Sequence, residues 1–348
     1  MKSNFEFLNR YWPVLAQLGA NAENYLYSDP NACIYKIGLF SERLVQEILL
    51  FENMPAPTTD NTHSNRIRML KRAGLLPRDI DNALYLLRRS RNSAVHTGAD
   101  SVDDTKTLLS ITYNLAVWFM ETYGDWEYNA PEYVMPEETH KEDLESVIAA
   151  QEQRIEELSK QLAVVKTAVS GTSKKERAKH SETVSAMMNW TEAQTRCLID
   201  EQLRKAGWEA DTQNLRYSKG TRPVKGRNIA ISEWPTNSAF QNHGYADYAL
   251  FIGEKLVALM DAKKMSEDVA ATIDVQIKDY ASHIRPEDLA YTIGTWGNYQ
   301  VPFLFASNGR AYLEQIRTKS GIWFLDVRDE ANQSYPIRNW FSPSDLEE

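Results

Sequence analysis

Two aspartates and a lysine, Asp247, Asp261 and Lys263, are the residues of this sequence best suited to carry out chemistry. They lie in the stretch GYADYALFIGEKLVALMDAKK, where Gly253 and Glu254 separate two apolar runs. A hairpin of two strands would bring both carboxylates to the same end. Carboxylate and carbonyl oxygens are the ligands that Mg²⁺ prefers, and such an ion activates water for phosphodiester hydrolysis. The stretch therefore predicts a metal-dependent phosphodiesterase site.

The alternation of side chains along the second strand of this hairpin assigns a role to each of its last residues. Asp261 and Lys263 share one face, whereas Ala262 points away and offers its backbone carbonyl. We expect Asp247, Asp261 and the Ala262 carbonyl to bind the metal, and Lys263 to orient the attacking water or stabilise charge on the phosphate. The alternative is a surface ion pair, because a single D-x-K occurs often by chance.

An α/β domain at residues 188–335 is predicted to position this constellation. Thr191 is the expected N-cap of a helix that runs to Ala206 and ends at Gly207. Period-two and short apolar runs predict strands at 246–252, 256–260, 290–295, 303–307 and 322–327, and a helix is expected at about 269–283. The first two strands should form an antiparallel hairpin through the turn at Gly253 and Glu254.

Asp247 together with Asp261-Ala262-Lys263 resembles the PD-(D/E)xK nuclease superfamily. Two departures from its pattern are that Ala246 stands where Pro is usual and that the second acid is Asp rather than Glu. The resemblance implies a restriction-endonuclease-like fold with a mixed central sheet. It also implies a role for Glu192, because this superfamily often carries an acid in the preceding helix that is aimed at the metal. A solvated helical glutamate is the alternative.

Gln276 and Tyr280 share one helical face at i and i+4 spacing. This QxxxY element after the (D/E)xK strand resembles the restriction subunits of type I restriction-modification enzymes, in which it is linked to nuclease activity. VPFLFASNGRAY at 301–312, MKSNFEFL at the start and AGW at 206–208 resemble the same subunits. The resemblance implies a Mg²⁺-dependent double-strand DNA endonuclease module that works in a complex with methylation and specificity subunits, the latter reading the DNA sequence.

Family restriction subunits carry ATP-driven translocase domains after the nuclease, but no G-x-x-x-x-G-K-[ST] loop occurs in this sequence. We therefore expect no ATP hydrolysis by this chain itself. It is interpreted either as an N-terminal fragment of a longer subunit or as a free-standing relative, and the fragment is favoured.

A basic segment at 211–227 stands out in a chain whose formal net charge is -9. Its basic residues, set against a single acid, are Arg216, Lys219, Arg222, Lys225 and Arg227. Because the segment directly precedes the acidic constellation, we expect it to contact DNA. A solvated loop is the alternative.

The front of the chain predicts an all-α domain at 1–130, with helices at 34–51, 83–91 and 105–123. A heptad helix and basic linker follow at 137–180. The heptad positions are Leu144, Ile148, Gln151, Ile155, Leu158, Leu162, Val165 and Val169. This helix could form a coiled coil, fold back on its own chain or dock onto a partner subunit, and 170–179 is interpreted as a solvated linker or an arm near nucleic acid.

Arg91 and His96 in RRSRNSAVH resemble the R-x(4-6)-H motif of helical HEPN domains, some of which are metal-independent RNases. In such chemistry a His and an Arg act on the ribose hydroxyl and the phosphate. A structural or partner-binding role is favoured here. The rival hypothesis for the whole chain is accordingly a HEPN-type RNase or docking module with a degenerate nuclease fold.

The sequence shows no signal peptide and no long apolar stretch, so we expect a cytoplasmic protein without membrane contact. Its two cysteines, Cys33 and Cys197, are far apart and form no CxxC pair. This excludes a disulfide framework and a cysteine-based zinc site, and both are expected to be buried apolar residues.

Overall fold

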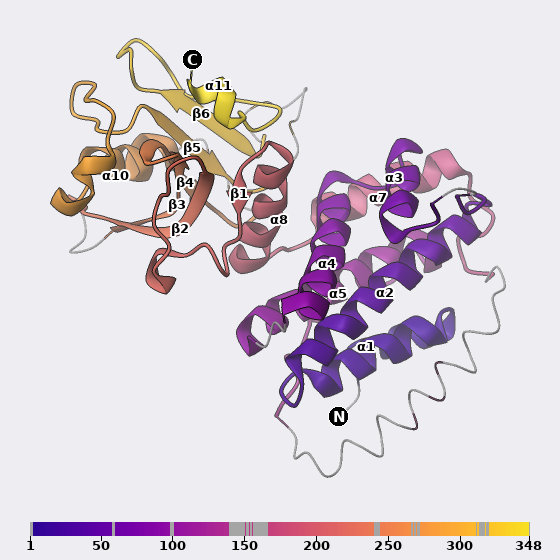
Figure 1. Ribbon diagram of the computed structural model, residues 1–348. Helices are drawn as coiled ribbons and strands as arrows, with labels where there is room; N and C mark the ends of the chain where they lie inside the picture. The colour runs from indigo at the N-terminus through magenta and orange to yellow at the C-terminus, as the bar shows by residue number, and fades with distance from the viewer. Residues whose placement is uncertain are drawn as a thin grey trace. The chain divides into compact units, whose positions relative to one another are not determined.

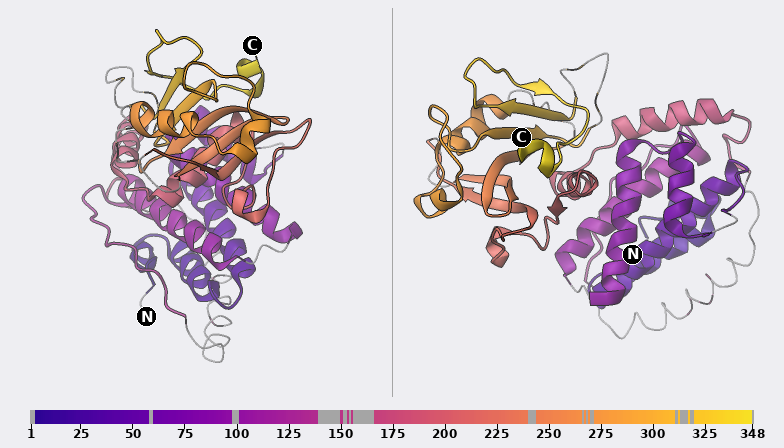
Figure 2. Two further views of the ribbon diagram at one scale, coloured as in Figure 1. Left: turned by 90° about the vertical axis from the view of Figure 1, so that its left-hand side faces the viewer. Right: turned by 45° about the horizontal axis from the view of Figure 1, so that its top comes forward.

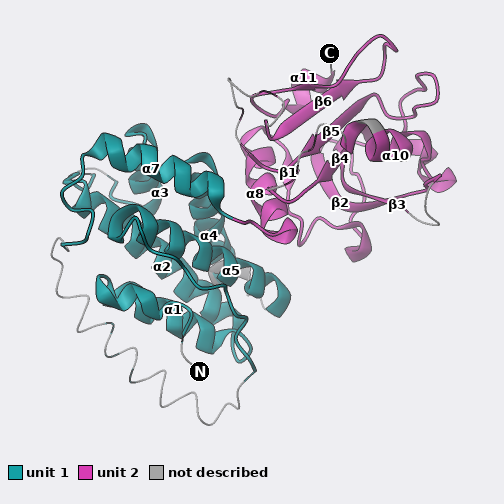
Figure 3. Ribbon diagram, turned by 180° about the vertical axis from the view of Figure 1, so that it is seen from behind, with its two compact units in different colours: residues 1–188 teal, residues 189–348 magenta. Residues whose placement is uncertain are grey.

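The computed structural model describes residues 3–57, 60–97, 101–138, 166–239, 244–265, 272–310 and 320–347, and the single positions 150, 153, 155, 267, 269, 312 and 317. The chain divides into two compact units, which comprise residues 1–188 and 189–348 (Figure 3). No helix among these residues is long and apolar enough to cross a membrane.

Unit 1 is a bundle of helices, as the sequence predicted (Figure 1). Its helices are η1 (Glu6–Arg10), α1 (Pro13–Tyr25), α2 (Pro30–Phe51), α3 (His63–Arg72), α4 (Arg78–Thr97), α5 (Val102–Phe119), η2 (Met120–Gly124) and α7 (Lys174–Met187). Polar caps begin several of them. Asp29 accepts a hydrogen bond from the Ala32 N–H at the start of α2, and Ser101 does the same for Asp104 at the start of α5.

The interpretation of 170–179 as a linker is wrong from Lys174 onward, where a helix begins, although most side chains of the segment are exposed. Ser173 and Glu176 form a capping box that begins α7, and the Arg177 side chain is bound in bidentate fashion by Glu52, the C-cap of α2, with both N–O distances 2.8 Å. Val169, the last heptad position, lies buried in the turn before α7 rather than in a helix. Ile155 is helical, and the other six positions, Leu144, Ile148, Gln151, Leu158, Leu162 and Val165, lie outside the described residues.

Unit 2 contains a seven-stranded mixed sheet whose strands follow one another in chain order. They are β1 (Glu209–Ala210), β2 (Asn228–Thr236), β3 (Gly244–Ile252), β4 (Lys255–Ala262), β5 (Phe303–Ser307), β6 (Ile322–Asp326) and β7 (Tyr335–Pro336). The pairs β1–β2 and β4–β5 are parallel and the other four are antiparallel. The predicted hairpin is confirmed as β3–β4, with Gly253 of its turn at φ 59°.

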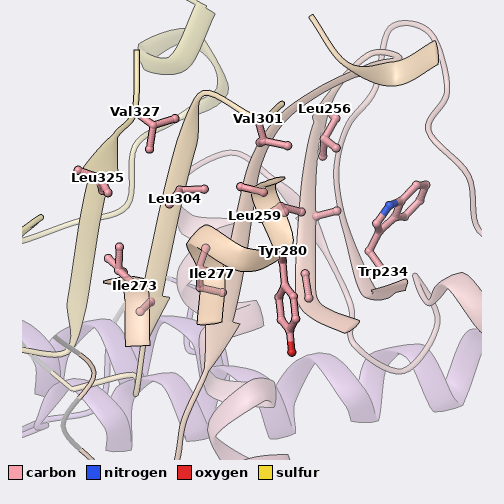
Figure 4. Packing of buried hydrophobic residues seen from close by; sticks show 14 of the residues in the cluster. Trp234, Leu256, Leu259, Ile273, Ile277, Tyr280, Val301, Leu304, Leu325 and Val327 are labelled. Atoms are coloured by element: carbon pink, nitrogen blue, oxygen red, sulfur yellow. The ribbon is translucent and has the colours of Figure 1, made fainter. Parts of the chain in front are cut away.

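Helices lie on both faces of this sheet (Figures 1 and 2). The helical elements of unit 2 are α8 (Glu192–Lys205), η3 (Tyr217–Lys219), η4 (Ile273–Ile277), α10 (Lys278–Ser282), η5 (Pro286–Tyr291) and α11 (Pro343–Glu347). Ile199 and Leu203 of α8 pack with Met260 on one face, whereas Ile273 and Ile277 pack with Leu259 on the other (Figure 4). Because both faces are covered, the central strands are buried along nearly their whole length.

Several elements of unit 2 differ from the prediction, among them the short strands β1 and β7, which were not predicted. Strand β2 was not predicted, because nearly all of its side chains are buried and its sequence lacks apolar–polar alternation. No strand forms at 290–295: η5 covers the first two residues, and Thr292 makes an isolated bridge to Leu256. The apolar side chain of Ile293, within this range, is exposed.

Candidate active site

The β3–β4 hairpin brings two carboxylates together at one end of the sheet. Tyr248 pairs with Met260, so the next residues outward, Asp247 and Asp261, face each other. Only 7% of Asp247 and 2% of Asp261 is exposed. Asp247 Oδ2 accepts a hydrogen bond from the Ala262 N–H at 2.6 Å, so Ala262 holds the first acid through its amide.

The crowding of these acids has an electrostatic consequence. Burial and the neighbouring Asp261 raise the pKa of Asp247 to about 7, against the opposing effect of Arg196. Two carboxylates that share a buried site repel each other, and a bound cation relieves that repulsion. The hairpin end is therefore a place where positive charge is stabilised.

Lys263 supplies one of the positive charges at this site. Its Nζ lies 2.6 Å from Oδ2 of the buried Asp261 carboxylate, so the two groups form a short ion pair. Burial lowers the pKa of Lys263, but the Asp261 carboxylate outweighs this effect and the net shift is upward. Lys263 is thus held as an ammonium ion beside the second acid.

Gln276 and Tyr280 continue the contacts of Lys263 on the face of the sheet that η4 and α10 cover. Lys263 Nζ donates to Gln276 Oε1 at 3.0 Å, and Gln276 Nε2 donates to the Tyr280 hydroxyl at 3.0 Å. Figure 4 shows the Tyr280 hydroxyl pointing away from the apolar cluster in which its ring is buried. Gln276 lies in the π-helical turn η4, a local geometry often found at functional sites.

Arg196 is a residue of this site that the sequence reasoning missed. It lies on α8, pairs with Asp247 Oδ1, and also lies 2.7 Å from Glu192 Oε1 and 3.7 Å from Glu233 Oε1. Glu192, the predicted third acid, therefore joins the site through Arg196, and its side chain is 46% exposed. The only signal in the sequence was the i, i+4 spacing of Glu192 and Arg196, which is also typical of a surface pair.

Three arginines of the basic segment are engaged within unit 2. Arg216 Nη1 lies 3.3 Å from Glu233 Oε1, Arg222 stacks on the Tyr217 ring at 3.7 Å, and Arg227 pairs with Glu209. The remaining two, Lys219 and Lys225, are exposed and have no ion-pair partner within the described ranges. These two lysines are the cations of the segment most available to a ligand.

The donor set fits a hard divalent ion of the Mg²⁺ type. Asp247 and Asp261 bring carboxylate oxygens together, and Ala262 adds a backbone carbonyl of the adjoining residue. Nowhere in the described part of the chain do three or more His, Cys, Asp or Glu side chains gather as a metal-binding group. Mg²⁺ commonly binds through one or two carboxylates and keeps several waters, so two acids suffice.

The motif residues of unit 1 are placed differently. Arg91 of α4 pairs with Glu42 of α2 at 2.9 Å and lies over the Tyr35 ring, so its guanidinium joins two helices. The backbone of His96 is helical, and its side chain lies outside the described residues. Cys33 and Cys197 are both buried and neither forms a disulfide, as expected.

Comparison with known proteins relates both parts of the chain to restriction enzymes. Residues 209–348 match the family model of the second domain of the type I restriction enzyme EcoKI endonuclease subunit, and residues 20–162 match DUF4145, a domain of unknown function. The EcoKI endonuclease subunit of Escherichia coli K12 is 30% identical over 419 aligned positions. The alignment covers 99% of this chain but only 36% of that relative. No solved structure gives a significant match.

Proposed function

Since this chain is a homologue of the endonuclease (R) subunit of EcoKI-type restriction enzymes, we propose that its unit 2 is the DNA-cleaving module of such a subunit. The observation that carries the proposal is the meeting of two buried carboxylates, Asp247 and Asp261, with the ammonium group of Lys263 ion-paired to the second. The reaction is Mg²⁺-dependent hydrolysis of phosphodiester bonds in double-stranded DNA.

Each residue of the site has a separate task in this proposal. Asp247, Asp261 and the Ala262 carbonyl would hold Mg²⁺, which when bound lowers the pKa of water and stabilises charge on the phosphate. The Ala262 N–H fixes the Asp247 carboxylate. Lys263 places its ammonium against the attacked phosphate or the attacking water, and Gln276 holds Lys263 in that position. Glu192 does not contact the metal in this proposal but acts on the site through its ion pair with Arg196.

The partners of the chain follow from the same homology. We propose that it works in the cytoplasm in a complex with methylation and specificity subunits, and that Lys219 and Lys225 contact the DNA backbone, with Arg216, Arg222 and Arg227 beside them. The chain spans little more than a third of the length of the EcoKI subunit. ATP would act only through translocase domains outside this sequence.

The test is cleavage of plasmid DNA by the assembled restriction enzyme that carries Asp261→Ala or Lys263→Ala in this region. We expect each variant to lose at least about 1000-fold in cleavage rate, and wild-type cleavage to stop in EDTA. ATP hydrolysis by the same preparations should be unchanged, which shows that the complex has assembled.

Arg91→Ala in unit 1 is the matched control, because Arg91 is also an ion-paired charged residue. We expect cleavage within about threefold of wild type for this variant. Full cleavage by Asp261→Ala would refute the assignment, and so would loss of cleavage in Arg91→Ala with the site variants unaffected.

A further inference from the structure

Arg196, which belongs to none of the predicted motifs, lies next to three carboxylates of the candidate active site. Its guanidinium faces three carboxylates, those of Asp247, Glu192 and Glu233, and its side chain is 19% exposed. Its Nε is buried and has no hydrogen-bond acceptor in the described part of the chain, so the group is held through its Nη atoms. Arg196 therefore has several alternative acceptors rather than one fixed partner.

The contact with Asp247 limits what else that acid can bind. Asp247 Oδ2 accepts the Ala262 N–H, and Oδ1 accepts from Arg196. Both oxygens are thus engaged, and one of the two positive charges beside the acids belongs to Arg196. A divalent cation that binds Asp247 Oδ1 must share this oxygen with a guanidinium or displace it, and like charges at such a distance repel strongly in a buried site.

Glu233 provides the place to which Arg196 can move. It lies on β2 with a positive φ of 53°, a conformation that costs energy for a residue other than glycine. Its Oε1 atom lies 3.7 Å from Arg196 Nη1 and 3.3 Å from Arg216 Nη1, so two arginines share one carboxylate. If Arg216 turns to a DNA phosphate, Glu233 becomes fully available to Arg196.

We propose that Arg196 is a positioning residue that competes with the divalent cation for Asp247, and that Glu233 takes up Arg196 when Arg216 engages the phosphate backbone. This inference rests on the proposed function, because it takes Asp247 and Asp261 as the metal ligands. It makes metal binding tighter when DNA is in place, so the module does not hold a fully charged metal site in the absence of substrate.

The test measures Mn²⁺ binding to the full chain by calorimetry without DNA. Arg196→Gln should lower the Mn²⁺ dissociation constant about tenfold or more, because it removes the competing charge and keeps a polar side chain. Arg216→Gln should lower it severalfold, because it leaves Glu233 to Arg196 alone. Glu233→Gln should raise it severalfold, because Arg196 then has one acceptor fewer. Arg196→Lys, which keeps the charge, should stay near wild type.

The proposal is tested by whether each variant raises or lowers the Mn²⁺ dissociation constant. Weaker or unchanged Mn²⁺ binding by Arg196→Gln, in a protein with the wild-type circular dichroism spectrum, overturns it. If Arg196→Gln does not fold, Glu233→Gln decides instead, since that side chain is 34% exposed, and tighter binding by this variant contradicts the proposal. Asp261→Asn distinguishes failure of the proposed metal site from failure of the proposed role of Arg196. Mn²⁺ binding that survives Asp261→Asn refutes the metal site of the proposed function, whereas Asp261-dependent binding with no effect of Arg196 refutes only the role of Arg196.

Discussion

The two units both contain buried ion pairs, but they arrange the charges in different ways. In unit 1 an acid pairs with bases and joins helices: Glu52 binds Arg177, and Glu42 binds Arg66 and Arg91. In unit 2 two acids, Asp247 and Asp261, lie next to each other on neighbouring strands. In a buried pair of opposite charge each group offsets the desolvation of the other, whereas two like charges at one buried point cost free energy unless they bind a counter-charge.

This difference shows which feature distinguishes a candidate active site from a structural charge cluster. The Arg91 motif of unit 1 has the residue types of a catalytic pair, yet its guanidinium is engaged by Glu42 and Tyr35. At the hairpin end of unit 2, Asp261 is buried beside a second acid and the pKa of Asp247 is raised to about 7. Perturbed groups of this kind gather at functional sites.

The largest effect on stability is expected from breaking a structural pair of unit 1. Glu52→Ala leaves Arg177 buried without its bidentate partner, and the two side chains are 1% and 8% exposed. The free energy of unfolding of unit 1 should fall by about 3 to 5 kcal/mol. Urea unfolding followed by circular dichroism measures this loss. Mn²⁺ binding at the hairpin end should persist, and a loss below about 1 kcal/mol would show that the pair is not structural.

His63 of unit 1 and Asp200 of unit 2 should contribute to the pH dependence of stability with opposite signs. In unit 1, burial lowers the pKa of His63 to about 4, with Arg66, Arg88 and Arg91 adding to the shift and Glu42 opposing it. At this histidine the unfolded chain therefore binds more protons between pH 4 and 6.5, so the stability that neutral His63 contributes is lost as the pH falls through this window. The slope is at most about 1.4 kcal/mol per pH unit.

In unit 2, burial raises the pKa of Asp200 to about 6, against the effect of Arg204. The folded state then binds more protons between pH 4 and 6, so this contribution is lost as the pH rises through the window. Unfolding curves from pH 4 to 8 for His63→Gln and Asp200→Asn measure both terms. Each substitution should remove the contribution of its own residue to the slope of unfolding free energy against pH. The two variants should therefore change the wild-type slope in opposite directions, and changes in the same direction would contradict this assignment.

A smaller effect is expected from the residues that hold Lys263. Gln276→Ala removes the Lys263 Nζ–Gln276 hydrogen bond, which involves a charged donor, and should lower the cleavage rate about 10- to 100-fold. Tyr280→Phe removes only the Gln276–hydroxyl contact and should cost about fivefold. Single-turnover cleavage with the two variants measures the difference. A larger loss in Tyr280→Phe than in Gln276→Ala would show that the hydroxyl acts on the substrate directly.

The smallest effect is expected at the exposed pair of Arg227 and Glu209. Both side chains are about half exposed, at 44% and 45%, so Arg227→Gln should change the unfolding free energy by less than about 1 kcal/mol. Lys225→Gln should have an equally small effect on the unfolding free energy. It should, however, lower the slope of the logarithm of the DNA-binding constant against that of salt concentration by about 1, which corresponds to one phosphate contact. Filter binding at several salt concentrations compares the two variants, and equal salt slopes for Lys225→Gln and wild type would remove this lysine from the interface.

The strands that carry the acids could be predicted from the sequence, because local patterns determine them. Gly253 fixes the hairpin turn, but the register that places Asp247 opposite Asp261 also depends on a shift in strand pairing between Leu250 and Phe251, which was not predicted. Strand β2 could not be predicted, because it is buried on both faces and contains Glu233 and Pro235. The segment 170–179 was misinterpreted because Gly171 and the run of lysines suggested an irregular break, whereas Ser173 and Glu176 cap a helix there and Arg177 binds Glu52, far away in the chain.

Arg196 shows what the sequence cannot reveal about the site. Its partners Asp247 and Glu233 come from two different strands, and no local spacing in the sequence predicts that both contact Arg196. The positions of Gln276 and Tyr280 could be proposed from their helical spacing, and the structure brings them to Lys263. Their catalytic roles, like those of Asp247, Asp261 and Lys263, stay predictions.

The most direct test of the central claim is the anomalous scattering of Mn²⁺ in crystals of the full chain. A peak between the carboxylates of Asp247 and Asp261, lost in Asp261→Asn, is the result that this account predicts. A peak elsewhere on unit 2, or one that Asp261→Asn leaves in place, would contradict the assignment of the hairpin end as the metal-dependent nuclease site.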